Sequence, residues 1–200
     1  MLSYLAAALP EGTSSAPRLL ALQCALRMNT AMRVRLPKGI LRSLRLDSSD
    51  PWDALEHARW LRIRPGSTGN EIVAELLDAT LLGQIPARPD RTQAADWALR
   101  LTTPSATGGA ADPQLRLVSL YLTAHADPET RTGMTELDEM SRACATPSTR
   151  LLNVLEQLAV TGPLKSWEVR WLWGDLHWTL ACHTAGQKSP TPADPKTPGG

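Results

Sequence analysis

Apolar residues recur three and four positions apart in the stretch that ends at Gly162, a spacing that predicts two consecutive amphipathic helices. We expect Thr135 to cap the first helix, over residues 134–145, because its hydroxyl can accept the amide of Asp138. The second helix opens at Thr146–Pro147, a cap residue followed by a proline in the first turn, and ends near the glycine. The apolar stripes of the two helices contain Leu137, Met140, Cys144, Leu151, Leu152, Leu155 and Leu158.

Alternation of apolar and polar residues replaces this helical spacing further along the chain. Residues 167–173 and 176–180 alternate on either side of a Gly174–Asp175 turn, which predicts a β-hairpin. The large apolar residues of the hairpin are Trp167, Val169, Trp171 and Trp173 on one strand face and Trp178 on the second strand. We expect these rings to pack in the core and across the strands. If a thin hairpin leaves some exposed, they mark a dimer or partner interface, or a surface that stacks on bases.

Helix, turn, helix and hairpin follow one another over residues 134–181, and this order resembles the winged helix-turn-helix of bacterial transcriptional regulators. The residues that carry the resemblance are Thr135, Leu137, Met140, Thr146, Pro147, Ser148, Thr149, Leu158 and Gly162. The resemblance implies a mostly α fold with small β-hairpins, an α+β class, whose second helix enters the DNA major groove. It also implies a homodimer, because such regulators commonly pair about a two-fold axis. The alternative is a small α+β core with no nucleic-acid role.

A similar pattern occurs earlier in the chain. Asp50–Pro51 opens an expected helix over residues 50–60, and alternating residues at 61–64 and 71–77 flank a glycine-containing turn. Further apolar helices are expected over 17–32, 37–46 and 114–125. Each half then holds a long helix, a short helix, a proline-started helix and a hairpin, and the two prolines are 96 positions apart. We predict tandem winged helix-turn-helix domains, and one larger domain is the alternative.

The same patterns predict the domain boundaries. An N-terminal winged-helix-like domain occupies residues 1–84, and residues 85–111 form a linker that contains a short helix. A C-terminal winged-helix domain occupies residues 112–183. Residues 184–200 form a disordered tail, because their mixture of Pro, Thr, Lys and Gly cannot bury a core.

Composition limits the function classes. The formal net charge is only +1, so the whole-chain balance indicates no polyanionic partner. The sequence has no phosphate-loop, dinucleotide-binding or zinc-protease motif, so we expect neither an enzyme nor a cofactor. Cys24 and Cys144 fall in apolar helical patterns and are expected to be buried free thiols. The set Cys182, His183 and His177 is too small for structural zinc, so no metal site is expected. Without a signal peptide or an apolar span of about 20 residues, a cytoplasmic protein with no membrane contact is expected.

Basic residues concentrate in the first half. Residues 17–65 hold nine arginines and one lysine against four acidic residues, and alternation turns Arg62 and Arg64 outward. The DNA-binding residues that we expect are Arg33, Arg35, Lys38, Arg42, Arg45, Arg59, Arg62, Arg64, Ser148, Thr149, Arg150 and Asn153. The basic ones would contact phosphates, and those of the second half would read bases or phosphates. For any single arginine, a solvated face or a docking site for an acidic partner is the alternative.

Two functions follow from this distribution. We predict a DNA-binding protein, a sequence-specific transcriptional regulator that binds double-stranded DNA as a homodimer. However, residues 110–160 are net negative by three, which suits a phosphate backbone poorly. The alternative is a winged-helix adaptor of a replication, plasmid-maintenance or transcription assembly, with the Trp-rich hairpin 167–178 binding the protein partner. A continuous positive face across both third helices and wings favours DNA, whereas a Trp-rich neutral face favours the adaptor.

Overall fold

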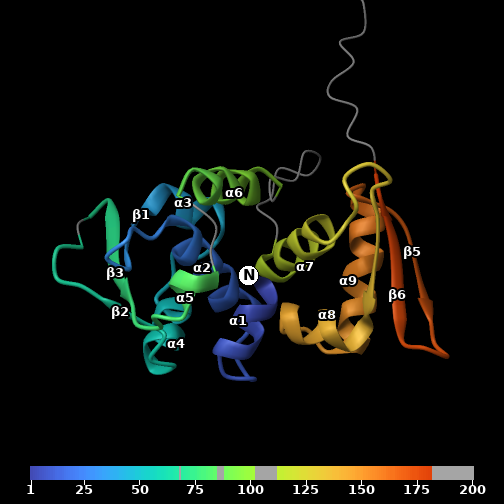
Figure 1. Ribbon diagram of the computed structural model, residues 1–200, viewed down its shortest axis with the longest axis horizontal. Helices are drawn as coiled ribbons and strands as arrows, with labels where there is room; N and C mark the ends of the chain where they lie inside the picture. Colours follow the sequence, from blue (N-terminus) through green and yellow to red (C-terminus); the bar gives the residue numbers. More distant parts are fainter. Residues whose placement is uncertain (68, 85–87, 102–111, 182–200) are drawn as a thin grey trace, which may run out of the picture.

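In the computed structural model, the described residues form two units with one order of elements, helix–strand–helix–helix–strand–strand (Figure 1). The structure describes residues 1–67, 69–84, 88–101 and 112–181. The first unit comprises α2 (Ser15–Arg27), β1 (Arg33–Pro37), α3 (Lys38–Ser43), α4 (Asp50–His57), β2 (Leu61–Ile63) and β3 (Glu71–Leu76). The second comprises α7 (Pro113–Ala124), β4 (Thr132–Glu136), α8 (Leu137–Cys144), α9 (Ser148–Thr161), β5 (Leu164–Arg170) and β6 (Asp175–Leu180). Outside the units lie α1 (Leu2–Ala8), α5 (Leu81–Gln84) and α6 (Arg88–Leu101).

Each unit holds a small antiparallel sheet in which the last strand of the unit lies in the middle. The strand orders are β1-β3-β2 and β4-β6-β5. The pairing registers also match: residues 33–37 pair with 75–71, and residues 132–136 pair with 179–175. The mixed α and β composition that we predicted is confirmed. The expected two-stranded hairpins are wrong in one respect, because each sheet of the described chain gains a third strand, β1 or β4.

Strand β4 occupies the start of the segment in which the sequence predicts a helix over residues 134–145. Thr135 lies in this strand, so its predicted role as a helix cap is wrong, and its hydroxyl donates to the carboxylate of Glu139 at 3.0 Å. Gly133 allows the strand to form, because a Cβ at this position would lie 2.1 Å from the ring of Trp178. A glycine adds nothing to an alternating apolar pattern, so this strand carries a weak sequence signal.

Helix α9 contains the apolar stripe predicted for the second helix. Its buried side chains are Leu151, Val154, Leu155 and Leu158. Leu152 is half-buried, and Gly162 ends the helix with a left-handed φ of 99°, as predicted. Thr146 is not the cap of this helix: its hydroxyl donates to the carbonyl of Cys144 at 3.0 Å, and the helix begins after Pro147.

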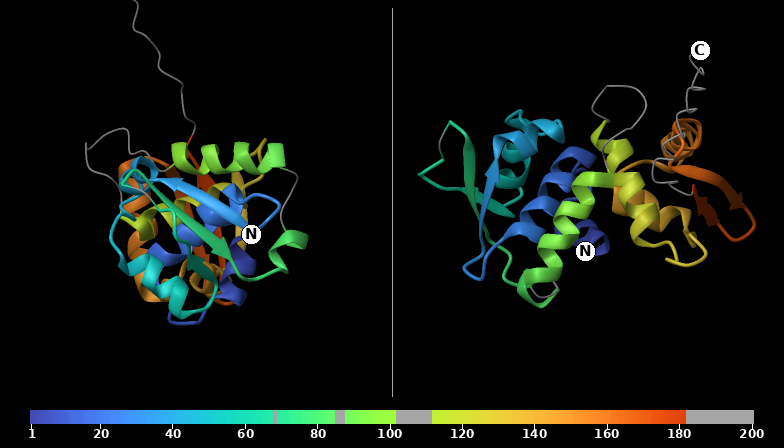
Figure 2. Two further views of the ribbon diagram at one scale, coloured as in Figure 1. Left: turned by 90° about the vertical axis from the view of Figure 1, so that its left-hand side faces the viewer. Right: turned by 90° about the horizontal axis from the view of Figure 1, so that it is seen from above.

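The junction between the two units is built from helices. Helix α1 packs against α2 of the first unit and α8 of the second, and the helices of both units gather between the two sheets (Figure 2). The Ser15 hydroxyl donates to the carbonyl of Cys144 at 3.0 Å. The buried Arg18 guanidinium donates to the carbonyls of Arg142 and Ala143, and burial lowers its pKa. One buried apolar cluster runs through both units, so the junction is held by packing as well as by these hydrogen bonds.

Helix α6 covers α2 and also contacts α7. Arg27 pairs with Asp96 of this helix at 2.9 Å, and Arg91 donates to the carbonyl of Met28 at 3.2 Å. Residues 88–101 of the predicted linker 85–111 are thus helical, as part of it was predicted to be. Its residues 85–87 and 102–111 lie outside the described residues, as does the predicted tail. Within the described part of the chain, no helix is long and apolar enough to cross a bilayer.

Candidate binding surfaces

The outer face of the first sheet brings together arginines from two strands. In β1, Val34 and Leu36 point into the core while Arg33 and Arg35 are exposed. Residues paired across strands share a face of the sheet. The register therefore places on one outer face, here called the arginine face, the residues Arg33, Arg35, Arg62, Arg64, Glu71, Val73 and Glu75. Four of the predicted DNA-binding residues meet on this face.

Ion pairs neutralise half of these arginines. Arg35 lies 3.0 Å from Glu71, and Arg64 lies 3.3 Å from Glu75. Exposed pairs of this kind contribute only about 0–1 kcal/mol each. Within the described chain, Arg33 and Arg62 have no ion-pair partner, so the face has a surplus of two positive charges.

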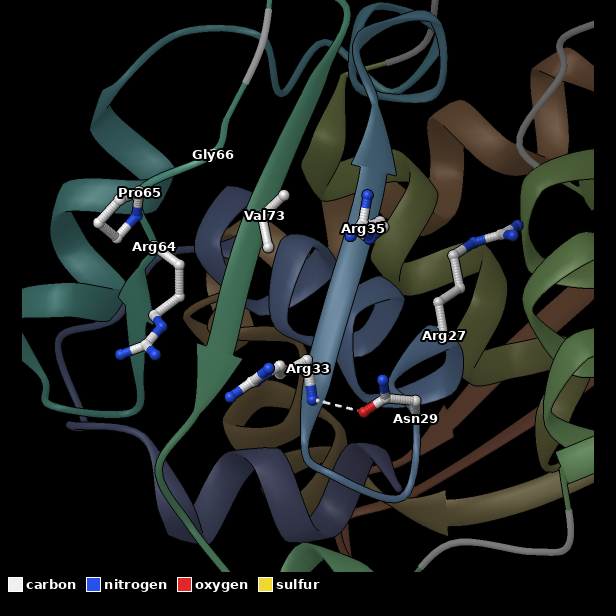
Figure 3. Close-up of a pocket in the computed structure, with 8 residues that line it drawn as sticks. All are labelled: Arg27, Asn29, Arg33, Arg35, Arg64, Pro65, Gly66 and Val73. Atoms are coloured by element: carbon white, nitrogen blue, oxygen red, sulfur yellow. Dashed lines mark hydrogen bonds between the residues drawn. The ribbon is translucent and has the colours of Figure 1, made fainter.

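A hollow of about 500 Å³ lies against this face (Figure 3). This arginine hollow is lined by Arg27, Asn29, Arg33, Arg35, Arg64, Pro65, Gly66 and Val73. The Asn29 carboxamide accepts the amides of Ala31 and Arg33 at 3.0 and 2.9 Å, which orders the turn from α2 into β1. Val73 lies on the middle strand between the arginines of its two neighbours. The hollow therefore combines guanidinium groups with an apolar patch.

The other predicted basic residues of the first unit lie outside its sheet. Lys38 is half-buried at the start of α3, and Arg42 is exposed near its end. Arg45 and Arg59 are exposed after α3 and α4, each with a left-handed φ. Burial, and to a lesser extent the charge of Arg45, lowers the pKa of Arg116, so Arg45 lies toward the second unit. The structure thus divides the predicted basic residues between separate places.

The third helix of each unit carries little positive charge. Helix α4 exposes Asp50 and Asp53 in its first turn. The predicted residues of α9 are exposed at Thr149, Arg150 and Asn153, whereas Ser148 is half-buried and donates to the carboxylate of Asp138 at 3.3 Å. A helix that reads a major groove with its first turns lies among phosphates. Neither helix offers the continuous positive face that favours DNA.

Three large apolar side chains project from the turn between β5 and β6. Trp171, Leu172 and Trp173 are 71%, 83% and 72% exposed, and we call them the aromatic tip. The amides of Trp173 and Gly174 both donate to the carbonyl of Arg170 at 2.9 Å, so the chain already turns here. The prediction that Trp171 and Trp173 pack in the core is therefore wrong. Alternation in the sequence continues beyond the residue at which the strand ends.

The other two tryptophans of this hairpin pack toward the core, as predicted, Trp178 fully and Trp167 in part. Trp178 is buried, and its indole nitrogen donates to the carbonyl of Leu122 at 3.1 Å. Trp167 pairs with it across the strands and is half-buried. These two rings form the inner surface of the sheet, so the hairpin does not depend on the aromatic tip for its packing.

The outer face of the second sheet carries the opposite charge to the arginine face. The register places Glu136, Asp175 and Arg170 side by side next to the aromatic tip. The following row contains Met134, His177 and Glu168. With three carboxylates against one arginine, this acidic face has a surplus of two negative charges. The two sheets share a strand order, and their outer faces differ in the sign of their charge.

Both cysteines of the described residues lie in the interior of the protein. Cys24 and Cys144 are buried and free, as predicted, and burial raises the pKa of both thiols, so both stay protonated at neutral pH. Within the described ranges, no cluster of three His, Cys, Asp or Glu side chains is placed to hold a metal ion. Cys182 and His183 lie outside those ranges.

No family model, curated protein or solved structure matches this chain. The two surfaces therefore rest on geometry alone. Sequence reasoning missed Arg27, Asn29 and Val73 as parts of the arginine hollow, because they lie on a helix, a turn and a different strand. The alternation of Arg33, Val34, Arg35 and Leu36 is a strand signal that could have identified β1.

Proposed function

We propose that both units are winged helices and that the protein is a non-catalytic adaptor that binds another protein through the aromatic tip. The fold proposal is supported by the strand that precedes two helices and a hairpin in each unit, by the equivalent strand orders, and by the matching five-residue pairings of β1–β3 and β4–β6. In this description the β2–β3 and β5–β6 turns are the wings. The predicted cytoplasmic location belongs to the same proposal.

The observation that carries the adaptor function is the exposure of the aromatic tip. Each aromatic side chain can bury about 150–250 Å². Large adjacent apolar side chains held in water mark interaction sites, and tryptophan is enriched among the residues that dominate binding energy. Trp171 and Trp173 lie in a turn whose backbone is already ordered by hydrogen bonds, so little backbone conformational entropy is lost when they dock.

The first test replaces the tip. Trp171→Ser with Trp173→Ser is expected to leave the melting temperature unchanged, because neither ring is buried. Val160→Ser, an exposed position on α9, is the matched control. A photo-crosslinking residue at Leu172 should capture one discrete protein in cells of the source organism. The double serine variant should not be crosslinked to this protein, whereas the Val160→Ser control should be crosslinked as the wild type is.

Two outcomes contradict the adaptor function. If the double serine variant still captures the protein at full yield, the tip does not form the contact with the partner. Unfolding of this variant, measured by circular dichroism, would show that the rings support the core after all.

A second function, binding of duplex DNA, is favoured by the arginine face. Arg33 and Arg62 are exposed and flank Glu75 in one row of the sheet, and within the described chain neither forms an ion pair. The hollow beside them adds further guanidinium groups. Phosphates are neutralised by such groups, and affinity then depends on salt. Because α4 exposes Asp50 and Asp53, this binding would follow the backbone and not read bases.

Mobility shifts test this second function. If Arg33 and Arg62 neutralise two phosphates, the logarithm of affinity should fall with the logarithm of salt with a slope of about −1.8. Arg33→Ala with Arg62→Ala should weaken binding to all fragments alike and flatten the slope. Arg150→Ala with Asn153→Ala on α9 is the control and should change neither. Two results would contradict DNA binding through the arginine face. One is the absence of binding at low salt, and the other is a preference for particular DNA sequences that is lost in the Arg150→Ala, Asn153→Ala variant.

A further inference from the structure

We propose that the aromatic tip of one copy inserts into the arginine hollow of a second copy, so that the chain associates head to tail. This inference rests on the proposed function in one respect, that the tip binds protein. It goes further by naming the partner as another molecule of this chain.

The tip has the shape and the surroundings of an inserting group. Trp171, Leu172 and Trp173 are exposed in the turn between β5 and β6. The hairpin that these two strands form lies at one end of the molecule (Figures 1 and 2). Directly behind them, the register places Glu136 and Arg170 on either side of Asp175, a row with a surplus of one negative charge. The projecting surface is therefore apolar at its end and acidic at its base.

The arginine hollow offers the complementary arrangement. Val73 and Pro65 provide apolar atoms; Arg33, Arg35 and Arg64 lie around Val73, and Pro65 lies at the margin beside Arg64 (Figure 3). A guanidinium group stacks favourably on the face of an indole ring, and arginine suits this contact better than lysine because it is planar and weakly hydrated. Seated in the hollow, the tip would place its two indoles against these guanidinium groups.

Charge also matches over the wider surfaces. The arginine face has a surplus of two positive charges, and the acidic face has a surplus of two negative charges. When the tip is seated, the carboxylates of Glu136 and Asp175 approach the arginine face, where Arg33 and Arg62 form no ion pair within the described chain because Glu75 between them pairs with Arg64. Complementary potentials of this kind select orientation and accelerate encounter.

The position of the two surfaces determines the form of the assembly. The sheets lie at opposite ends of the longest axis, with the helices between them (Figure 1). The α1–α8 packing and the Arg18 hydrogen bonds hold the units together, so a tip meets the hollow of another molecule and not its own. A contact between two different surfaces leaves both ends of the assembly open, and open chains form unless the rotation closes a ring.

Sedimentation velocity of the purified full chain tests this inference. The wild type is expected to associate as its concentration rises, and added salt should weaken the association. Two double variants should each weaken association at least about tenfold. The tip variant, Trp171→Ser with Trp173→Ser, removes both indole rings. The hollow variant, Arg33→Glu with Arg35→Glu, reverses the charge of two residues that line the hollow. Val160→Ser should behave as the wild type.

Mixing the two variants gives the sharpest result. The tip variant retains an intact hollow and the hollow variant retains an intact tip, so an equimolar mixture should form dimers that do not grow further. Each variant alone should remain monomeric at the same concentration.

Three results would overturn the inference: a wild type that stays monomeric up to about 1 mM, a tip variant that associates like the wild type, or a mixture that stays monomeric. The adaptor function fails separately. If the wild type is monomeric and Leu172 still captures another protein, the adaptor function stands and head-to-tail association is wrong. If association occurs and only this chain is captured, the inference stands and an adaptor for a different protein is wrong.

Discussion

Replacing Leu155 with alanine is expected to lower the free energy of unfolding by about 2–5 kcal/mol. Leu155 is fully buried in α9, between Leu151 and Leu158 of the same stripe. Removing three side-chain carbons there loses their transfer free energy and leaves a cavity that packed neighbours fill only in part. Urea denaturation followed by circular dichroism measures this change through the midpoint, provided that its slope is unaltered.

The control for this substitution lies on the opposite face of the same helix. Arg150→Ala with Asn153→Ala should leave the melting temperature nearly unchanged, because both side chains are exposed. Alanine is also a better helix former than asparagine. A large loss of stability in this pair, or none in the leucine variant, would show that the buried face of α9 is assigned wrongly.

Replacing Gly133 with alanine is the second substitution with a large expected effect, a loss of about 1–3 kcal/mol. A Cβ at Gly133 would lie 2.1 Å from the Trp178 ring, a distance that real contacts do not reach. The ring is buried and its indole nitrogen is bound to the carbonyl of Leu122, so it cannot simply rotate away. Either strand β4 or the ring must shift. Thermal unfolding monitored by tryptophan fluorescence reports both stability and the environment of the ring.

Gly39 provides a matched control, because the chemical change is the same. It lies in α3, and a Cβ there meets no atom within 4 Å. Gly39→Ala should therefore leave stability unchanged or raise it by up to about 1 kcal/mol, since glycine loses more conformational freedom on folding. Equal effects at the two glycines would contradict the close approach of Trp178 to β4.

The two candidate functions use different ends of the molecule. Binding through the aromatic tip leaves the arginine hollow free, whereas head-to-tail association occupies both surfaces at once. DNA and a second copy would compete for the arginine face, because both need Arg33. The mobility-shift and sedimentation experiments can therefore be combined, and added duplex DNA should dissociate the chains if both proposals hold.

Sequence by itself determined the parts of this protein that depend on local periodicity. The buried stripe of Leu151, Leu155 and Leu158 and the end of α9 at Gly162 follow from helical spacing and from the freedom of glycine at positive φ. The outward position of Arg62 follows from strand alternation. The similarity of the two halves was also readable, since the same order of patterns recurs 96 positions later.

Tertiary structure alone decided the binding surfaces. Strand β4 exists because Gly133 makes room for Trp178, a residue far along the chain, and no local pattern reports that contact. Strand pairing brings Arg33 of β1 beside Glu75 of β3 and so creates the arginine face, while α2 contributes Arg27 to the hollow. Whether a tryptophan is buried or exposed was likewise decided by where β5 ends and turns. Periodicity reports which face a residue occupies within its own element, whereas these surfaces depend on which elements meet.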